Sequence, residues 1–194
     1  MQAKRSWPLM LAAFAFILTL TACSGKDAPL ASTEPTAPVS EVPDPVQAEP
    51  VPIEVGLAAP DFTTTLVDGS SFTLSEQQGK VVLLNFWATW CGPCVGEMPA
   101  FSRLVDTYGS QLALLAVNSG EDEQTVKSFL DKNGYTFPVA LDPDWALGEL
   151  YPTDAIPYTV IIAPDGTVAS IQLGASNADE MFDHYCQEID KVLS

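Results

Sequence analysis

The hydrophobic pattern of residues 54–194 alternates between strand-like and helix-like segments. The run Val81–Trp87 is apolar on both faces, as expected of a central strand that is covered on both sides. From Pro93 to Tyr108 apolar residues recur at helical spacing, Gly109 predicts the end of that helix, and Pro99 predicts a kink in it. The same patterns predict strands at 112–117, 138–141, 159–163 and 167–173, and helices at 123–132, 145–150 and 177–193.

A β-hairpin is predicted to open this region. The short strands Phe62–Val67 and Ser71–Leu74 flank a turn signal, Asp-Gly-Ser, at residues 68–70. Alternation of strands and helices after a hairpin indicates the α/β class. We expect a three-layer α/β/α sandwich with a mixed central sheet over residues 54–194.

The first 22 residues have the layout of a secretory signal peptide. Lys4 and Arg5 form a charged start, and the apolar segment 9–20 is shorter than the roughly 20 residues of a membrane span. Residues 20–23, Leu-Thr-Ala-Cys, resemble the bacterial lipoprotein processing box, in which the cysteine, here Cys23, carries the lipid. The alternative is an uncleaved signal anchor. Both predict a protein tethered to a bacterial membrane on its extracytoplasmic side.

Residues 23–53 are predicted to form a flexible spacer. They contain seven prolines among small, polar and acidic residues, and no helical or strand period survives that density of proline. A proline-rich ligand for a partner domain is the alternative function of this segment.

The chain is strongly acidic, with 25 acidic and 8 basic residues and a formal net charge of −17. Such a field disfavours nucleic acid and anionic lipid headgroups and would steer basic partners at low salt. We therefore predict no nucleic-acid partner, and we assign no further function to the charge.

Two cysteines lie three residues apart at the junction between the predicted central strand and the helix that follows it. Cys91-Gly92-Pro93-Cys94 is the spacing of a dithiol/disulfide redox centre. At the helix N-terminus, free N–H groups and the helix dipole favour a thiolate, so Cys91 is the predicted nucleophile and Cys94 the resolving thiol. A zinc site is the alternative, but the chain has one histidine, His184, and no second Cys-x-x-Cys. We predict no metal and no cofactor beyond the cysteine pair.

Three motifs carry a resemblance to a known family: Ala-Pro-Asp-Phe at residues 59–62, Asn-Phe-Trp-Ala-Thr-Trp-Cys-Gly-Pro-Cys at 85–94, and Ile-Pro-Tyr-Thr at 156–159, before a strand that ends in Ala-Pro-Asp-Gly at 163–166. Residues 54–194 resemble the thioredoxin fold and, more narrowly, the membrane-tethered TlpA/ResA-like proteins. The resemblance implies a thiol-disulfide oxidoreductase. Gly92-Pro93 matches reducing thioredoxins, whose potential is near about −270 mV, rather than the strong periplasmic oxidant near about −120 mV.

The resemblance also implies roles for side chains near the thiols. Asn85 stands where cytoplasmic thioredoxins carry a buried aspartate, and an amide cannot exchange that proton. Glu97, three residues after Cys94, matches a glutamate that takes part in proton handling in TlpA/ResA-like proteins, so it is the predicted acid/base for Cys94. The alternative is an ordinary first-turn glutamate that complements the helix dipole.

Pro157 aligns with the cis-proline that faces the disulfide in thioredoxin-like proteins, although Ala155 departs from the glycine often seen before this pair. Ile156 and Tyr158 would help to hold a substrate strand beside the thiols, together with Gly92 and Pro93. Trp90 is predicted to lie on the docking surface.

Other residues are expected to be structural. Trp87 and Cys186 are predicted to lie in the core and His184 at the surface or its boundary.

The resemblance implies protein disulfide or dithiol substrates, such as apocytochrome c, oxidised partner enzymes or misoxidised exported proteins. It also implies a membrane thiol carrier as electron donor. The lipid anchor would supply the membrane contact, and we expect a monomer. The alternatives are a disulfide-forming oxidase or isomerase, a non-catalytic adaptor, and a peroxide-reducing relative.

Overall fold

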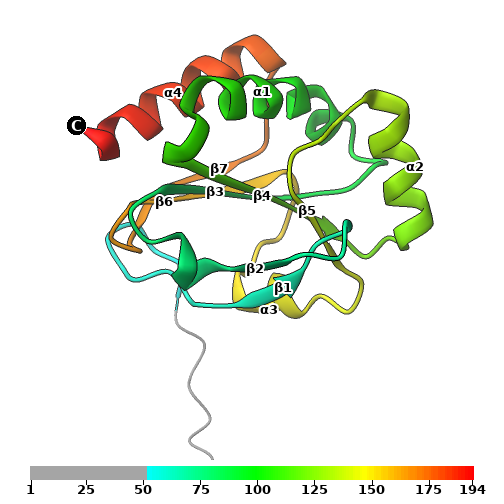
Figure 1. The fold of residues 1–194 in the computed structure, drawn as a ribbon, viewed down its shortest axis with the longest axis horizontal. Coiled ribbons are helices and arrows are strands. Elements are labelled where there is room, and N and C mark those ends of the chain that lie inside the picture. The colour runs from blue at the N-terminus through cyan, green and yellow to red at the C-terminus, as the bar shows by residue number, and fades with distance from the viewer. Residues whose placement is uncertain (1–51) are drawn as a thin grey trace, which may run out of the picture. The chain divides into compact units, whose positions relative to one another are not determined.

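The computed structural model describes residues 52–194, which Figure 1 shows as a coloured ribbon. The predicted signal peptide at 1–22, the lipidated Cys23 and the spacer as far as residue 51 lie outside the described residues. Within 52–194, every helix is too short or too polar to cross a lipid bilayer.

A five-stranded mixed sheet forms the middle layer. Its strands lie in the order β5-β4-β3-β6-β7; β3, β4 and β5 are mutually parallel, whereas β6 runs antiparallel to β3 and to β7. The strands are β3 (Val81–Trp87), β4 (Leu112–Ser119), β5 (Val139–Asp142), β6 (Tyr158–Ile162) and β7 (Val168–Leu173).

Helices and a hairpin cover the two faces of this sheet. In Figure 1, α1 and α4 lie above the sheet, α2 stands at its right-hand side, and the hairpin and α3 lie below it; α2 packs into the same core as α1 and α4. The prediction of a three-layer α/β/α sandwich with an N-terminal hairpin is confirmed. The covering elements are β1 (Thr63–Thr65), β2 (Ser71–Thr73), α1 (Gly92–Tyr108), α2 (Glu123–Asn133), α3 (Ala146–Leu150) and α4 (Ala178–Leu193), with short 3₁₀ turns at Leu74–Gln77 and Gly109–Gln111.

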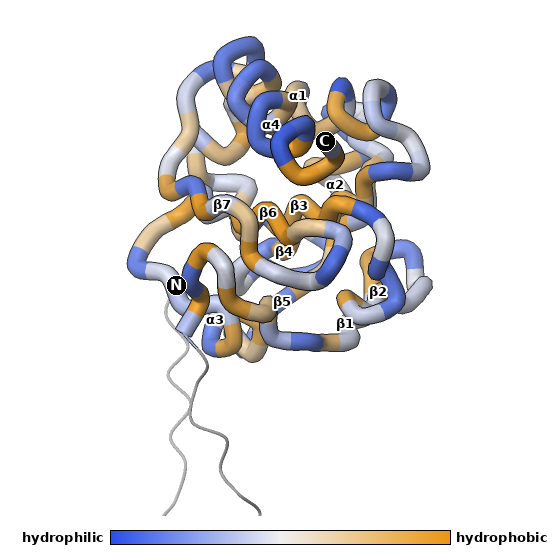
Figure 2. The backbone as a smooth tube through the Cα atoms, turned by 90° about the vertical axis from the view of Figure 1, so that its left-hand side faces the viewer, coloured by the Kyte–Doolittle hydropathy of each residue, from blue (hydrophilic) through white to orange (hydrophobic). Residues whose placement is uncertain are grey.

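Alternating side chains of β3 supply both hydrophobic cores. All seven of its residues are buried. Val81, Leu83 and Trp87 pack in the core under the helices, whereas Val82, Leu84 and Phe86 pack in the core with the hairpin and α3. Figure 2 shows hydrophobic stretches of β3, β4 and β6 enclosed between more polar outer segments. Because successive side chains of a strand point to opposite faces, Asn85 faces the helices.

Side-chain caps fix the helix starts. The Asp122 side chain accepts from the Thr125 N–H at the start of α2, and Asn177 accepts from two N–H groups at the start of α4. Gly134, with φ of 70°, ends α2 in the left-handed conformation that glycine adopts readily. The helix α1 continues through Pro99 to Tyr108.

The hairpin strands are shorter than predicted. Only three residues pair on each strand, and the residues from Leu74 to Gln77 form a 3₁₀ turn instead of extending β2. The carboxylate of Asp61 accepts hydrogen bonds from the N–H groups of Phe62 and Ser75, which hold the chain where the hairpin begins and ends.

Candidate active site

Cys91 and Cys94 form a disulfide at the N-terminus of α1. Cys91 is the N-cap residue, and its sulfur accepts from the Cys94 N–H at 3.3 Å. Gly92 and Pro93 fill the first turn and are exposed. Cys91 retains 6% exposure against 1% for Cys94, so an approaching sulfur reaches Cys91 first. This geometry fits the predicted order of nucleophile and resolving thiol.

Glu97 lies fully buried in the second turn of α1. Its Oε1 accepts from the Asn85 amide at 3.1 Å, and its Oε2 accepts from the Tyr185 hydroxyl at 2.8 Å. Burial raises the pKa of Glu97 to about 7, against the lowering effect of these two hydrogen bonds. The alternative of an ordinary first-turn glutamate that complements the helix dipole does not fit, because Glu97 lies beyond the first turn and is buried. A carboxyl group that titrates near neutral pH, one turn from Cys94, is suited to accept and return a proton.

The Ile156–Pro157 peptide bond is cis, the isomer that the resemblance implies. The carbonyl oxygen of Ile156 lies 3.8 Å from the sulfur of Cys91, so this loop borders the disulfide directly. Ile156 is half-buried, but the Tyr158 side chain is buried and packs against Phe86. Tyr158 could therefore hold a substrate only through its backbone.

The two tryptophans beside the motif differ in exposure. Trp87 is fully buried in the core, as predicted, whereas 69% of Trp90 is exposed immediately before Cys91. An exposed indole at this position is available to a docking partner.

The model of the family described as Redoxin matches residues 54–189. The chain belongs to the Redoxin family. Among curated proteins, this Redoxin is similar to the thiol-disulfide oxidoreductase ResA of Geobacillus kaustophilus, with 37% identity over 137 residues, 70% of this chain and 79% of that protein. It is also similar to the thioredoxin-like protein YneN of Bacillus subtilis, with 38% identity over 134 residues, 68% of this chain and 78% of that one.

A solved structure from Chlorobium tepidum, assigned as a thiol:disulfide interchange protein DsbE, superposes on this Redoxin with a TM-score of 0.67. The two share 31% identity, and the match covers 73% of this chain and 99% of the other. Together with the Cys91–Cys94 pair, these relatives confirm two predictions. The fold is thioredoxin-like, and the Redoxin is a thiol-disulfide oxidoreductase.

Glu121 fixes the segment that leads into the motif, a role that sequence reasoning missed. Its carboxylate accepts from the N–H and the hydroxyl of Thr89 and from the Asn118 amide. The β4–α2 connection is thereby tied to a residue two positions before Cys91. Only the position of Thr89 inside the motif hints at this contact in the sequence.

Sequence reasoning also missed Tyr185 and overestimated the burial of Cys186. The fully or nearly fully buried residues of α4 are Met181, Tyr185 and Ile189, so its core-facing stripe runs through Tyr185. Cys186 is a free, half-buried thiol that packs against the core under the helices, so the predicted core contact is present but the predicted burial is wrong. His184 is half-buried, in agreement with its predicted boundary position. A tyrosine four residues from both Met181 and Ile189 is the signal that was available for Tyr185.

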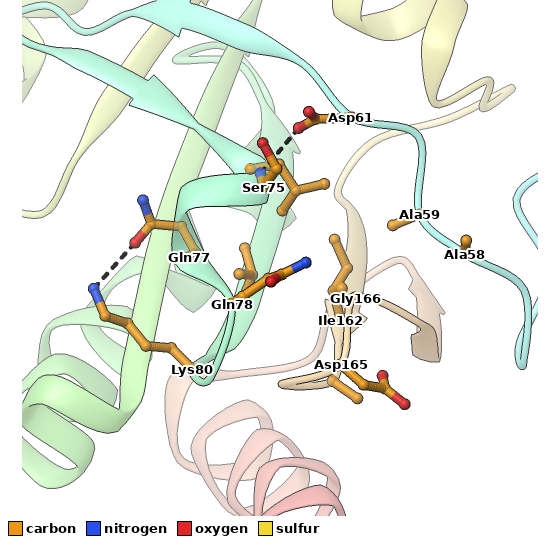
Figure 3. A pocket seen from close by; sticks show the side chains of 13 residues that line it. Ala58, Ala59, Asp61, Ser75, Gln77, Gln78, Lys80, Ile162, Asp165 and Gly166 are labelled. Atoms are coloured by element: carbon orange, nitrogen blue, oxygen red, sulfur yellow. Dashed lines mark hydrogen bonds between the residues drawn. The ribbon is translucent and has the colours of Figure 1, made fainter.

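A pocket of about 220 Å³ lies away from the disulfide, at the opposite end of β3. Figure 3 shows its polar wall, where Ser75 contacts Asp61 and Lys80 contacts Gln77. Val82 lines this pocket, whereas the motif follows Trp87, five residues and about 16 Å further along the strand. Among residues 52–194 no cysteine lines it, so this pocket is separate from the Cys91–Cys94 pair.

Proposed function

We propose that this thiol-disulfide oxidoreductase is an exported, lipid-anchored reductase of protein disulfides. The observation that carries the direction is the Gly92-Pro93 pair in the first turn of α1, between a partly accessible Cys91 and a buried Cys94. Reducing thioredoxins share this pair. The export and the anchor rest on the signal-like residues 1–22 and on Cys23.

Reduction of a client disulfide proceeds in two exchanges. The Cys91 thiolate attacks one client sulfur, a mixed disulfide forms, and the other client sulfur leaves as a thiolate and takes up a proton. The Cys94 thiolate then attacks the Cys91 sulfur, which closes the Cys91–Cys94 disulfide and releases the second client thiol. Two electrons pass to the client. A membrane thiol carrier, as the resemblance implies, returns the Redoxin to the dithiol form.

Glu97 manages the proton of Cys94 in the second exchange. Its carboxylate accepts the thiol proton when Cys94 becomes the attacking thiolate and returns it when the dithiol is regenerated. With a pKa raised by burial to about 7, the group is present in both protonation states near neutral pH. The Ile156–Pro157 loop, which borders Cys91, supplies backbone groups for an extended client segment.

The redox equilibrium of the protein against defined thiol/disulfide buffers, read by tryptophan fluorescence, tests the direction of transfer. A potential at or below roughly −240 mV is expected for a reductant. A value above roughly −170 mV would instead mark an oxidant or isomerase and contradict the proposal. Absence of exchange with any thiol/disulfide buffer would favour the adaptor, and rapid peroxide consumption with a thiol donor would favour the peroxide-reducing alternative.

A further inference from the structure

Four buried polar side chains from four different elements, Glu97 among them, form a closed hydrogen-bonded ring. Asn85 on β3 donates to Glu97 Oε1 at 3.1 Å and to Thr159 Oγ1 on β6 at 2.9 Å. The Thr159 and Tyr185 hydroxyls lie 3.0 Å apart, and Tyr185 on α4 donates to Glu97 Oε2 at 2.8 Å. Each of the four is at most 1% exposed. Water therefore cannot readily replace any of the hydrogen bonds within the ring.

The hydrogen bonds of this ring have a consistent donor-to-acceptor order that ends at the Glu97 carboxylate. The Asn85 amide nitrogen can only donate, and it does so to both Glu97 and Thr159. Since Thr159 Oγ1 accepts from Asn85, its own proton is available to the Tyr185 oxygen, and the Tyr185 proton is directed to Glu97 Oε2. Each carboxylate oxygen of Glu97 thereby accepts one hydrogen bond from the ring. This arrangement satisfies an ionised Glu97, whereas a proton on Oε2 directed at Tyr185 would require both hydroxyls to turn around.

The elements packed around Glu97 supply no opposite charge that could do the same work. The groups facing it are the neutral Asn85 from β3, the neutral Thr159 from β6 and the phenol of Tyr185 from α4. On α1 itself, Cys94 lies one turn earlier and is held in the disulfide. His184 adjoins the Tyr185 ring, with 5.5 Å between the ring centroids. Among residues 52–194, no ion pair to Glu97 is formed.

We propose that Tyr185 is a positioning residue for thiol-disulfide exchange: its hydroxyl, backed by Thr159, orients the Glu97 carboxyl group, one helical turn after Cys94, and favours its ionised, proton-accepting form. The proposal rests on the proton-transfer role given to Glu97 in the proposed function. Tyr185 is fixed for this task because its ring packs against Phe101 with a centroid distance of 5.9 Å. Consistently, the hydrogen bonds from Tyr185 and Asn85 lower the pKa of Glu97 against the effect of burial.

The experiment measures the pKa of Glu97 directly in the Tyr185→Phe variant. The carboxyl carbon-13 shift of Glu97 is titrated in the oxidised protein, in which the disulfide thiols do not titrate, and the line is assigned by its loss in Glu97→Gln. Because Tyr185→Phe removes one hydrogen bond to the charged carboxylate, we expect the pKa of Glu97 to rise by about one unit in this variant. Thr159→Val, which removes the hydroxyl behind Tyr185, is expected to raise it by less.

Tyr151→Phe is the matched control. The Tyr151 hydroxyl is also buried but donates to the Pro60 carbonyl at 2.6 Å, and its ring lies in the other core, with the hairpin. The Glu97 pKa should stay unchanged in this variant. A change as large as that in Tyr185→Phe would mean that loss of any buried tyrosine hydroxyl disturbs Glu97, and the proposal would be overturned.

The pH dependence of the alkylation rate of Cys94 in the reduced protein then distinguishes the role of Tyr185 from that of Glu97. The proposal is supported if Tyr185→Phe moves this pH profile to higher pH and causes no further shift in a Glu97→Gln background. If Glu97→Gln changes the profile but Tyr185→Phe changes neither the profile nor the Glu97 pKa, the role of Tyr185 is refuted and that of Glu97 stands. If neither variant changes the profile, the proton-transfer role of Glu97 fails, and this inference fails with it.

Discussion

Replacing Glu97 by glutamine should remove a pH-dependent loss of stability that the folded protein carries at its active site. The carboxyl group is fully buried, and its pKa is raised from 4.5 to about 7, mainly by burial. A raised pKa in the folded state means that folding favours the protonated acid. The associated stability is fully present below about pH 4.5 and is lost as the pH rises through about 7.

The magnitude follows from the shift. A difference of about 2.5 pKa units, at 1.36 kcal/mol per unit, amounts to about 3 kcal/mol of unfolding free energy lost between low and neutral pH. Glutamine has nearly the same shape but carries no charge that burial would penalise. Its amide oxygen can accept from Asn85, and its amide nitrogen can donate to the Tyr185 oxygen once the Tyr185 and Thr159 hydroxyls have turned around, a change that does not depend on pH.

Urea unfolding of the oxidised parent and of Glu97→Gln, measured at intervals from about pH 4 to about pH 8, tests the reasoning. The difference in unfolding free energy should shift by about 3 kcal/mol in favour of glutamine across this range. Other titrating groups are common to both proteins and cancel in the difference. Parallel pH profiles for the two proteins would refute the claim that Glu97 titrates near neutrality in the fold.

Two further predictions concern the cysteines. Cys94→Ser should leave the attack by Cys91 intact but block its resolution, so that a client protein stays attached to Cys91 as a mixed disulfide on a non-reducing gel; rapid release of the client would show that Cys94 is not the resolving thiol. The parent chain, expressed in bacteria, should incorporate a labelled fatty acid and Cys23→Ala should not; an unlabelled parent would argue against the lipid anchor.

The order of elements could be predicted from local sequence because each was marked by a strong short-range signal. The run Val81–Trp87, apolar on both faces, was predicted to be a central strand covered on both sides, and it is β3 at the centre of the sheet. Apolar spacing likewise predicted α1 and α4 to within one residue of their observed starts. The hairpin was less accurate, since Leu74 is apolar and extended the predicted strand, while tertiary contacts of Asp61 favour a 3₁₀ turn there.

By itself, the sequence determined the reaction. Cys91 and Cys94 are three residues apart, and the helix N-terminus that favours a thiolate at Cys91 is local, so spacing and composition were enough to predict a disulfide redox centre. Only the tertiary structure decided which side chains surround the Glu97 carboxyl group. Asn85, Glu97, Thr159 and Tyr185 lie on four elements and meet because the sheet order places β6 beside β3, under α1 and α4. The burial that shifts the pKa of Glu97 arises from this packing and has no short-range signal in the chain.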